Sequence, residues 1–186
     1  MRSEDEAEIV AGIPHLRRYA RGLVGDRERA DDLVQDTLER ACSKWRLWLV
    51  GSDLRAWLFT LMHNLFANQM RYQSRQPAGA GLVDIDDEAD TLSAPEAGLD
   101  VAIDLQRCLL RLPQDQRAVL LLVCLEDLSY AEVAKITGAP IGTVMSRLSR
   151  ARARLRELME GAVPAAEDSA VSGKTSATPV ILRRLK

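Results

Sequence analysis

Apolar residues recur at spacings of three and four along most of the chain, a pattern typical of amphipathic helices and not of strands. Three such stretches lie before residue 76, and the second and third begin after Asp26 and Asp53, which are good N-caps. The second stretch places on one face Ala30, Leu33, Val34, Thr37, Leu38 and Ala41. The third carries an apolar stripe made of Trp57, Leu58, Leu61, Leu65 and Tyr72. The pattern predicts three helices in this part of the chain.

The second part of the chain carries sharper start and stop signals. Leu112-Pro113 breaks one helix, and residues 114–125 are predicted to form the next, with Val119, Leu122 and Val123 facing inward. The run from Ser129 to Glu132 has the spacing of a capping box, and Gly138 followed by Pro140 ends the helix that it starts. A last amphipathic helix then buries Val144, Leu148, Ala151, Leu155 and Leu158. Two helices joined by this short turn form the pattern of a helix-turn-helix.

These elements predict an all-α protein with two small helical domains joined by a flexible acidic linker. The first domain is residues 1–76, the linker is 77–98 and the second domain is 99–161. Residues 162–186 are rich in Ala, Ser and Thr, so we expect a disordered tail. The end of the tail, VILRRLK, is apolar and basic, which leaves a short docking segment as the alternative.

The net charge of −2 hides a division along the chain. Residues 77–100 hold seven acids and no Lys or Arg, whereas residues 140–156 hold five arginines and no acid. The basic helix suits a protein that binds a polyanion in one place. The acidic stretch suits a segment that stays away from that polyanion.

Polar side chains gather at the start of the basic helix, where a recognition helix meets base edges. Arginine can pair with guanine through two hydrogen bonds, and serine is short enough to bond a base or a phosphate. The candidate DNA-reading residues are Thr143, Ser146, Arg147, Ser149 and Arg150. Arg152, Arg154 and Arg156 follow later in the helix and are expected to contact the DNA backbone or solvent.

A second candidate surface lies on the helix that follows Asp53. Arg55, Asn64, Asn68 and Arg71 fall off its apolar stripe. Large aromatic residues surround them in the sequence, and aromatic faces beside cations and amides can hold unstacked bases. The alternative is that these aromatics form the core; they are Trp45, Trp48, Trp57, Phe59, Phe66 and Tyr72.

Several classes of protein do not fit. The chain has no stretch of eighteen apolar residues and an acidic start, so we expect a cytoplasmic protein without membrane insertion. Cys42, Cys108 and Cys124 are widely spaced within helical patterns, which indicates core positions and neither disulfides nor a metal site. Sequence motifs of common enzymes are absent, and His15 and His63 are isolated. We expect no cofactor and no small-molecule substrate.

Four sequence blocks together resemble the extracytoplasmic-function (ECF) type of RNA polymerase sigma factor over about residues 9–160. The blocks are RADDLVQDTLERA, DLRAWLFTLMHNL, LPQDQRAVLLL and LSYAEVAKITGAPIGTVMSRLSRARARL. The resemblance implies a region 2 helical bundle, a region 4 helix-turn-helix and no enzymatic activity. It also implies three partners: core RNA polymerase, promoter DNA and an anti-sigma factor.

The resemblance assigns roles to particular residues. Core polymerase would be bound by Asp32, Leu33, Gln35 and Asp36. The segment from Leu49 to Arg71 would melt the minus-ten element and capture an unstacked base, with contacts from Arg55, Asn64, Asn68 and Arg71. The minus-thirty-five element would be read by Thr143, Ser146, Arg147, Ser149 and Arg150. Met145 stands where many relatives carry a cation, and the acidic linker would thread the active-site cleft and RNA exit path of the polymerase.

Two other functions fit parts of the pattern. A sigma mimic that only sequesters an anti-sigma factor would not need the arginine-rich helix or the polar residues of the melting helix. A dimeric helix-turn-helix repressor would need a ligand or dimerisation domain, and the first part of the chain carries the polymerase-binding and melting blocks instead.

Overall fold

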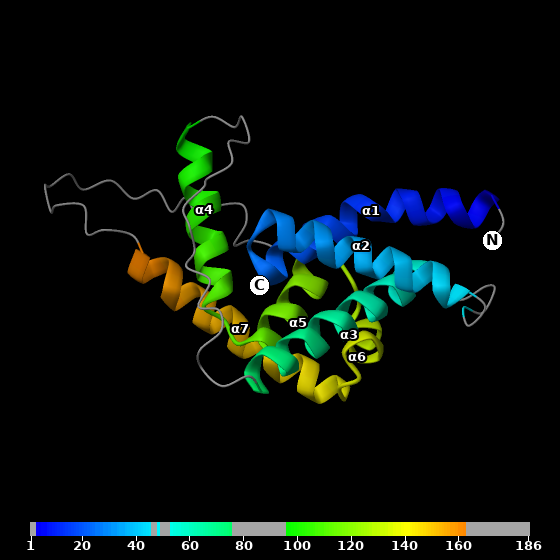
Figure 1. Cartoon of the computed structure of the whole chain (residues 1–186). Coiled ribbons are helices and arrows are strands. Elements are labelled where there is room, and N and C mark those ends of the chain that lie inside the picture. The colour runs from blue at the N-terminus through cyan, green and yellow to red at the C-terminus, as the bar shows by residue number, and fades with distance from the viewer. Residues whose placement is uncertain (1–2, 46–47, 49–52, 76–95, 163–186) are drawn as a thin grey trace, which may run out of the picture.

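The computed structural model describes residues 3–45, 48, 53–75 and 96–162, and in these residues it consists of helices without strands (Figure 1). The linker and tail predicted from the sequence therefore lie almost wholly outside the described residues. The helices are α1 (Ser3–Val24), α2 (Arg27–Ser43), α3 (Leu54–Arg75), α4 (Glu96–Leu110), α5 (Gln114–Cys124), α6 (Tyr130–Thr137) and α7 (Ile141–Ala162).

Local signals begin and end the helices of the first half, α1 to α3. The Asp26 carboxylate accepts a hydrogen bond from the Arg29 backbone N–H at 2.7 Å, and Asp53 accepts one from Ala56 at 3.1 Å. Both predicted N-caps are therefore confirmed. The face predicted for α2 is also confirmed, since its buried residues are Ala30, Leu33, Val34, Thr37 and Ala41, with Leu38 partly buried.

The apolar stripe predicted for α3 is wrong at one end. Tyr72 is 67 % exposed, and Trp57, Leu61 and Leu65 are only partly buried. The buried side chains of α3 are instead Leu54, Leu58, Phe59, Met62 and Phe66. The physical reason is that α3 packs on α1 and α2 with one face and on α6 with another, so its core residues do not form one stripe.

The second half, α4 to α7, follows the predicted order. Pro113 separates α4 from α5, and its carbonyl accepts the first backbone bonds of α5, from Gln116 and Arg117. Val119 and Leu122 are fully buried, and Val123 is partly buried. Helix α4 begins at Glu96, so its first three residues fall within the segment 77–98 that the sequence analysis assigned to the linker.

The helix-turn-helix is built as its sequence predicted. Ser129 and Glu132 form a reciprocal capping box at the start of α6, and these bonds hold the pKa of the Glu132 carboxyl below its ordinary value. Gly138 adopts a left-handed φ of 64° past the end of α6, a conformation that favours glycine. The five apolar positions predicted for α7 are all buried: Val144, Leu148, Ala151, Leu155 and Leu158.

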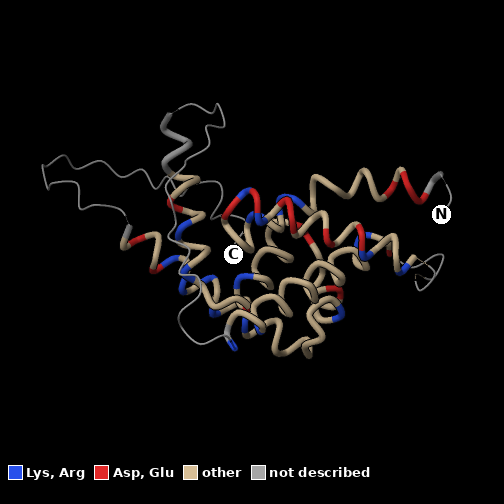
Figure 2. The backbone as a smooth tube through the Cα atoms, viewed as in Figure 1, with Lys and Arg blue, Asp and Glu red and all other residues tan. Residues whose placement is uncertain are grey.

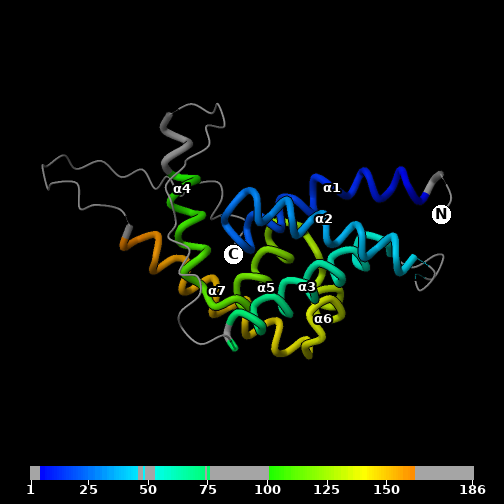
Figure 3. Tube along the Cα trace, viewed as in Figure 1, coloured from blue at the N-terminus to red at the C-terminus, as the bar shows by residue number. Residues whose placement is uncertain are grey.

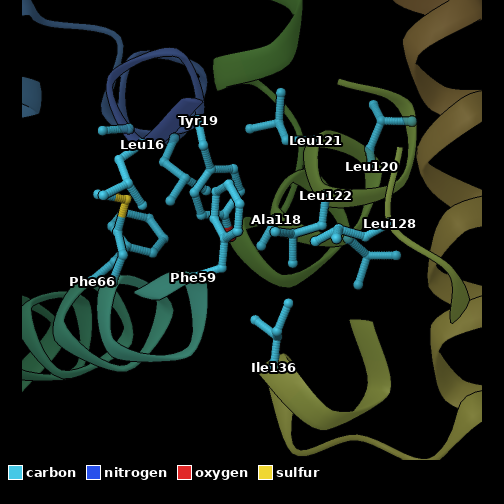
Figure 4. Close-up of a cluster of buried hydrophobic side chains, with 14 of the residues drawn as sticks. Leu16, Tyr19, Phe59, Phe66, Ala118, Leu120, Leu121, Leu122, Leu128 and Ile136 are labelled. Atoms are coloured by element: carbon cyan, nitrogen blue, oxygen red, sulfur yellow. The ribbon is translucent and has the colours of Figure 1, made fainter. Parts of the chain in front are cut away.

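The two halves pack directly on one another and share a continuous core. Helix α1 lies against α5, and α3 lies against α6 (Figure 3). Figure 4 shows Tyr19 and Leu16 above Phe59 and Phe66, with Ala118, Leu121 and Ile136 of the second half beside them. The Tyr19 and Phe59 rings meet edge to face, with centroids 5.3 Å apart. Apolar burial therefore joins the halves as well as stabilising each of them.

The prediction that the three cysteines occupy core positions holds for two of them. Cys108 is buried and Cys124 is partly buried, but Cys42 is exposed on α2 and does not belong to the core. Cys42 follows Ala41, the last buried position of the α2 face, so it points off that face. Among the described helices, none combines the length and the apolar character needed to cross a membrane.

The capping box offers a test of local stability. Replacing Ser129 with Ala removes the side-chain acceptor for the Glu132 backbone N–H and is expected to lower the free energy of unfolding by about 1 kcal/mol. Urea denaturation followed by circular dichroism measures this. The matched change Ser149→Ala, at an exposed position of α7, should alter the same quantity by less than about 0.5 kcal/mol.

Candidate nucleic-acid interface

The polar residues at the start of α7 divide into an outward and an inward group. Ser149 and Arg150 are exposed, whereas Thr143 and Ser146 are partly buried. The Arg150 guanidinium donates to the Ser146 carbonyl and hydroxyl oxygens, both at 3.2 Å, which holds it along the helix surface. Ser149 and Arg150 are therefore the predicted reading residues that are open to solvent at this end of the helix.

Arg147 points inward instead. Its guanidinium pairs with the Asp115 carboxylate of α5 at 2.9 Å, and its side chain is 28 % exposed. It also lines a pocket of about 320 Å³ between α3 and the second half, together with His63, Met70, Arg71, Gln114 and Asp115. Arg147 is thus held by Asp115 and turned toward the first half.

An open groove lies along the other side of α7. It has a volume of about 370 Å³ and is lined by Tyr130, Met145, Leu148, Ser149, Arg152, Ala153 and Arg156. Met145 is 52 % exposed and therefore stands on the open surface of the helix. Figure 2 shows basic residues along α7 and acidic residues in the N-terminal part of α1.

The four candidate residues of α3 do not share one face. Asn64, Asn68 and Arg71 are exposed at spacings of four and three, and the Arg71 guanidinium donates to the Asn68 side-chain amide oxygen, Oδ1, at 3.1 Å. Arg55 precedes Asn64 by about two and a half helical turns, which places it on the opposite side of the helix. The structure thus brings three of the four predicted residues together.

Most of the aromatic residues near α3 belong to the core. Trp48, Phe59 and Phe66 are buried. Trp45 stacks near Trp48, with centroids 4.8 Å apart, and meets Trp57 edge-on at 6.1 Å. Tyr72 is the large aromatic of α3 that is open to solvent, at 67 % exposure. Residues 49–52, at the start of the segment Leu49 to Arg71 to which the resemblance assigned melting and base capture, lie outside the described residues.

On α2 the predicted polymerase-binding residues are placed in two ways. Asp32, Gln35 and Asp36 are exposed, and the Gln35 amide donates to the Glu39 carboxylate at 3.1 Å. Leu33 is 1 % exposed and packs in the core. An exposed acidic and amide surface therefore lies on α2, and Leu33 supports it from beneath.

The sequence analysis missed a charged cluster between the halves. The Glu126 side chain has no exposed surface, and its carboxylate is 2.9 Å from His15 Nδ1, 3.0 Å from Arg18 and 2.9 Å from Arg55. Glu126 lies in the turn after α5, between Leu125 and Asp127, and the three partners come from α1 and α3. No spacing along the chain could reveal contacts over 71 to 111 residues.

His63 lies near this boundary in an unfavourable place for a charge. Burial, followed by the charges of Arg147 and Arg71, lowers the pKa of His63 to about 4. Its Nδ1 atom is buried and has no hydrogen-bond partner among the residues that the structure describes. The imidazole is therefore neutral near pH 7.

The two halves of the chain match two protein families, in the order of the sequence. Residues 9–63 match the family described as the Sigma2 domain of PhyR, and residues 102–155 match Sigma-70, region 4. The first match spans most of α1 to α3, and the second spans α4 to α7.

Whole proteins are similar over the same length. The chain is 41 % identical over 163 residues to the ECF RNA polymerase sigma factor EcfG of Rhodopseudomonas palustris, covering 87 % of each chain. It is 35 % identical over 144 residues to the ECF RNA polymerase sigma factor SigM of Mycobacterium tuberculosis, covering 77 % of this chain and 71 % of SigM.

Solved structures agree with this similarity. The sigma factor RpoE of Bartonella quintana, crystallised in complex with the anti-sigma factor NepR, matches with a TM-score of 0.68 and 34 % identity over 86 % of this chain and 98 % of that one. CnrH, in complex with the cytosolic domain of CnrY, shares the fold with a TM-score of 0.63 at 23 % identity, over 85 % of this chain and 88 % of that one.

His63, which is partly buried and whose Nδ1 atom is fully buried, predicts a pH dependence of stability. The unfolded chain takes up a proton on this residue below its ordinary pKa of 6.5, but the folded chain does so only near 4. The contribution of His63 to the free energy of unfolding is therefore fully present above about pH 6.5. It is lost as the pH drops toward 4, by at most about 3 kcal/mol. The groups facing His63 are Arg71, Arg147 and Asp115.

Urea denaturation of His63→Gln across this pH range is the measurement. The variant should lose less stability between pH 7 and pH 4 than the parent chain. The control Asn64→Gln, at an adjacent exposed position, should keep the parent's pH dependence. An equal change of the free energy of unfolding with pH in all three proteins would contradict the assignment of a desolvated, neutral imidazole to His63.

Proposed function

Because the chain belongs to the ECF group of RNA polymerase sigma factors, we propose that it binds core RNA polymerase through α2 and directs initiation by contacting promoter DNA with α3 and α7. The observation that carries the proposal is the arrangement of α6 and α7. A capped helix, a left-handed turn at Gly138 and an exposed polar start of α7 reproduce a DNA-reading helix-turn-helix. The role is one of assembly and recognition, without a chemical step of its own.

The minus-thirty-five element would be read by the start of α7. Ser149 and Arg150 are already exposed, and Thr143 and Ser146 lie beside them. Arg147 would have to leave Asp115 to reach a base. That exchange is inexpensive because Asp115 is 51 % exposed, and ion pairs with so much solvent contribute about 0 to 1 kcal/mol.

The minus-ten element would be met by the exposed face of α3. Asn64 and Asn68 offer paired donors and acceptors, Arg71 offers a cation, and Tyr72 offers an open aromatic ring for stacking. Arg55 lies on the opposite side of α3 and is held by Glu126. Its proposed contact with DNA requires that Glu126 release it.

Core polymerase would be bound by Asp32, Gln35 and Asp36 of α2. Carboxylates on one face of a helix can pair with basic residues of a partner, and rim charges of this kind steer association. Leu33 contributes by holding the helix on the core, since its side chain is buried.

A protein inhibitor is the other expected partner. The similar RpoE of Bartonella quintana was crystallised with the anti-sigma factor NepR. We therefore propose that a protein of the anti-sigma class also binds this chain, and that the complex forms in the cytoplasm, where core polymerase is found.

In vitro transcription tests the proposal. Purified chain is added to bacterial core RNA polymerase on genomic templates, and transcripts are mapped. Discrete start sites that core alone does not use are expected. Failure to bind core would overturn the proposal and favour a sigma mimic, whereas a stable dimer in gel filtration that binds DNA without core would favour a repressor.

The mapped promoters then allow a residue-level test. Arg150→Ala removes a proposed base contact and should weaken use of the parent promoter by about 1 to 3 kcal/mol, while relaxing specificity at one position. The matched control is Arg154→Ala, later on α7 and paired with Glu157 at 3.3 Å. It should weaken binding equally for all sequences and lower the salt dependence, so equal specificity profiles for both variants would contradict the assignment.

A further inference from the structure

The arrangement of the two halves is incompatible with simultaneous contact to both promoter elements. The minus-ten and minus-thirty-five positions are about 25 base pairs apart, or about 85 Å along B-form DNA. Yet His63 of α3 and Arg147 of α7 line one pocket, so the two proposed DNA-reading helices are neighbours. This argument rests on the proposed function: a chain that reads both elements has to separate its halves.

We propose that Glu126 is an autoinhibitory contact: it holds the free protein closed by binding Arg18, Arg55 and His15 of the other half. The Glu126 carboxylate pairs with the guanidinium of Arg55, a residue that the proposed function assigns to DNA contact. Glu126 therefore takes the place that a DNA phosphate would have. Arg55 Nη2 donates both to the Glu126 carboxylate at 2.9 Å and to the Glu126 carbonyl at 2.8 Å. Arg18 adds a bond to the Leu125 carbonyl at 3.0 Å.

The Glu126 cluster is well paired in the closed state, and water can replace these pairs when the halves separate. Glu126 has no exposed surface, so its charge depends entirely on these partners. The partners themselves are 40 to 48 % exposed and keep part of their hydration. Separation would return all four groups to solvent, so opening costs far less than stranding the carboxylate in the closed state.

Other polar atoms at this boundary are poorly satisfied in the closed state. Tyr19 Oη, Arg55 Nε, His63 Nδ1 and Arg117 Nε are buried without hydrogen-bond partners among the described residues. Burial, and next the Glu126 charge, raise the pKa of Tyr19. Each orphaned group gains water on opening, which favours an interface that separates.

The apolar part of the boundary includes a close approach of Gly22 in α1 to Leu121 in α5. The three atoms nearest to a Cβ built on Gly22 of α1 all belong to Leu121 of α5, the closest at 2.8 Å. A side chain at Gly22 would therefore contact Leu121 of the second half, which would have to shift to make room. The connecting residues 76–95, counted as fully extended chain, could reach about 70 Å, and the lengths of α3 and α4 at their ends add to this span. The covalent link therefore allows separation toward the distance of about 85 Å between the two promoter elements.

Glu126→Gln tests the contact in the full chain. The change keeps the shape of the side chain and removes its charge. Glu28→Gln, at an exposed position in the first turn of α2, changes the net charge equally and serves as the control. Small-angle scattering of the free proteins and the sigma concentration that gives half-maximal transcription with core polymerase are measured on the same samples.

We expect Glu126→Gln to enlarge the radius of gyration and to lower the half-maximal concentration by about tenfold. Loss of a wholly buried ion pair would change this concentration by several hundredfold, but the three partners of Glu126 are partly exposed, which reduces the effect. Gly22→Leu should act in the same direction without any change of charge, and circular dichroism confirms that each variant keeps its helices.

The outcomes separate this inference from the function on which it rests. Values for Glu126→Gln equal to those of Glu28→Gln would overturn the inference, and so would expansion without any gain in transcription. If no protein supports transcription at any concentration, the proposed function fails. Scattering alone then decides whether Glu126 closes the molecule.

Discussion

A carboxylate without exposed surface has to be neutralised by its neighbours, and for Glu126 those neighbours all come from the other half of the chain. The turn after α5 presents Glu126 to α1 and α3, and the apolar contacts of Tyr19, Phe59 and Leu121 close around it. The position of α3 beside α6, the orientation of Arg55 and the pocket that encloses His63 and Arg147 all depend on this association.

The same association connects the fold with regulation. A sigma factor has to present one surface to polymerase and two to DNA, and α2 and the outer faces of α3 and α7 offer such surfaces in the closed molecule. The closed state nevertheless holds Arg55 and Arg147 on carboxylates, Glu126 and Asp115. Both acids imitate the charge of a phosphate, so DNA or polymerase would compete with the chain's own residues. An inhibitor that stabilises the closed state would need no contact with either arginine.

The sequence predicted those features that depend on neighbours within about one helical turn. The Asp26 and Asp53 caps, the capping box at Ser129 and the left-handed Gly138 belong to this group, because each involves residues at most four positions apart. The outward position of Tyr72, the inward turn of Arg147 and the position of Arg55 off the face of Asn64 and Asn68 were missed. They are set by packing between halves, and periodicity on one helix does not record which sides are covered. Glu126 carried no local signal, since an acid in a turn is ordinarily solvated.

The distance between α3 and α7, in the free chain and on core polymerase, tests the account most directly. Exposed Gln69 and Ala153 can be replaced by cysteine for fluorophore pairs, after Ser replacement of Cys42, Cys108 and Cys124. Energy transfer should be high in the free chain and nearly absent in the complex with polymerase and promoter DNA, where the helices lie on the order of 85 Å apart. High transfer in both states, with transcription intact, would contradict a chain that opens to read two promoter elements.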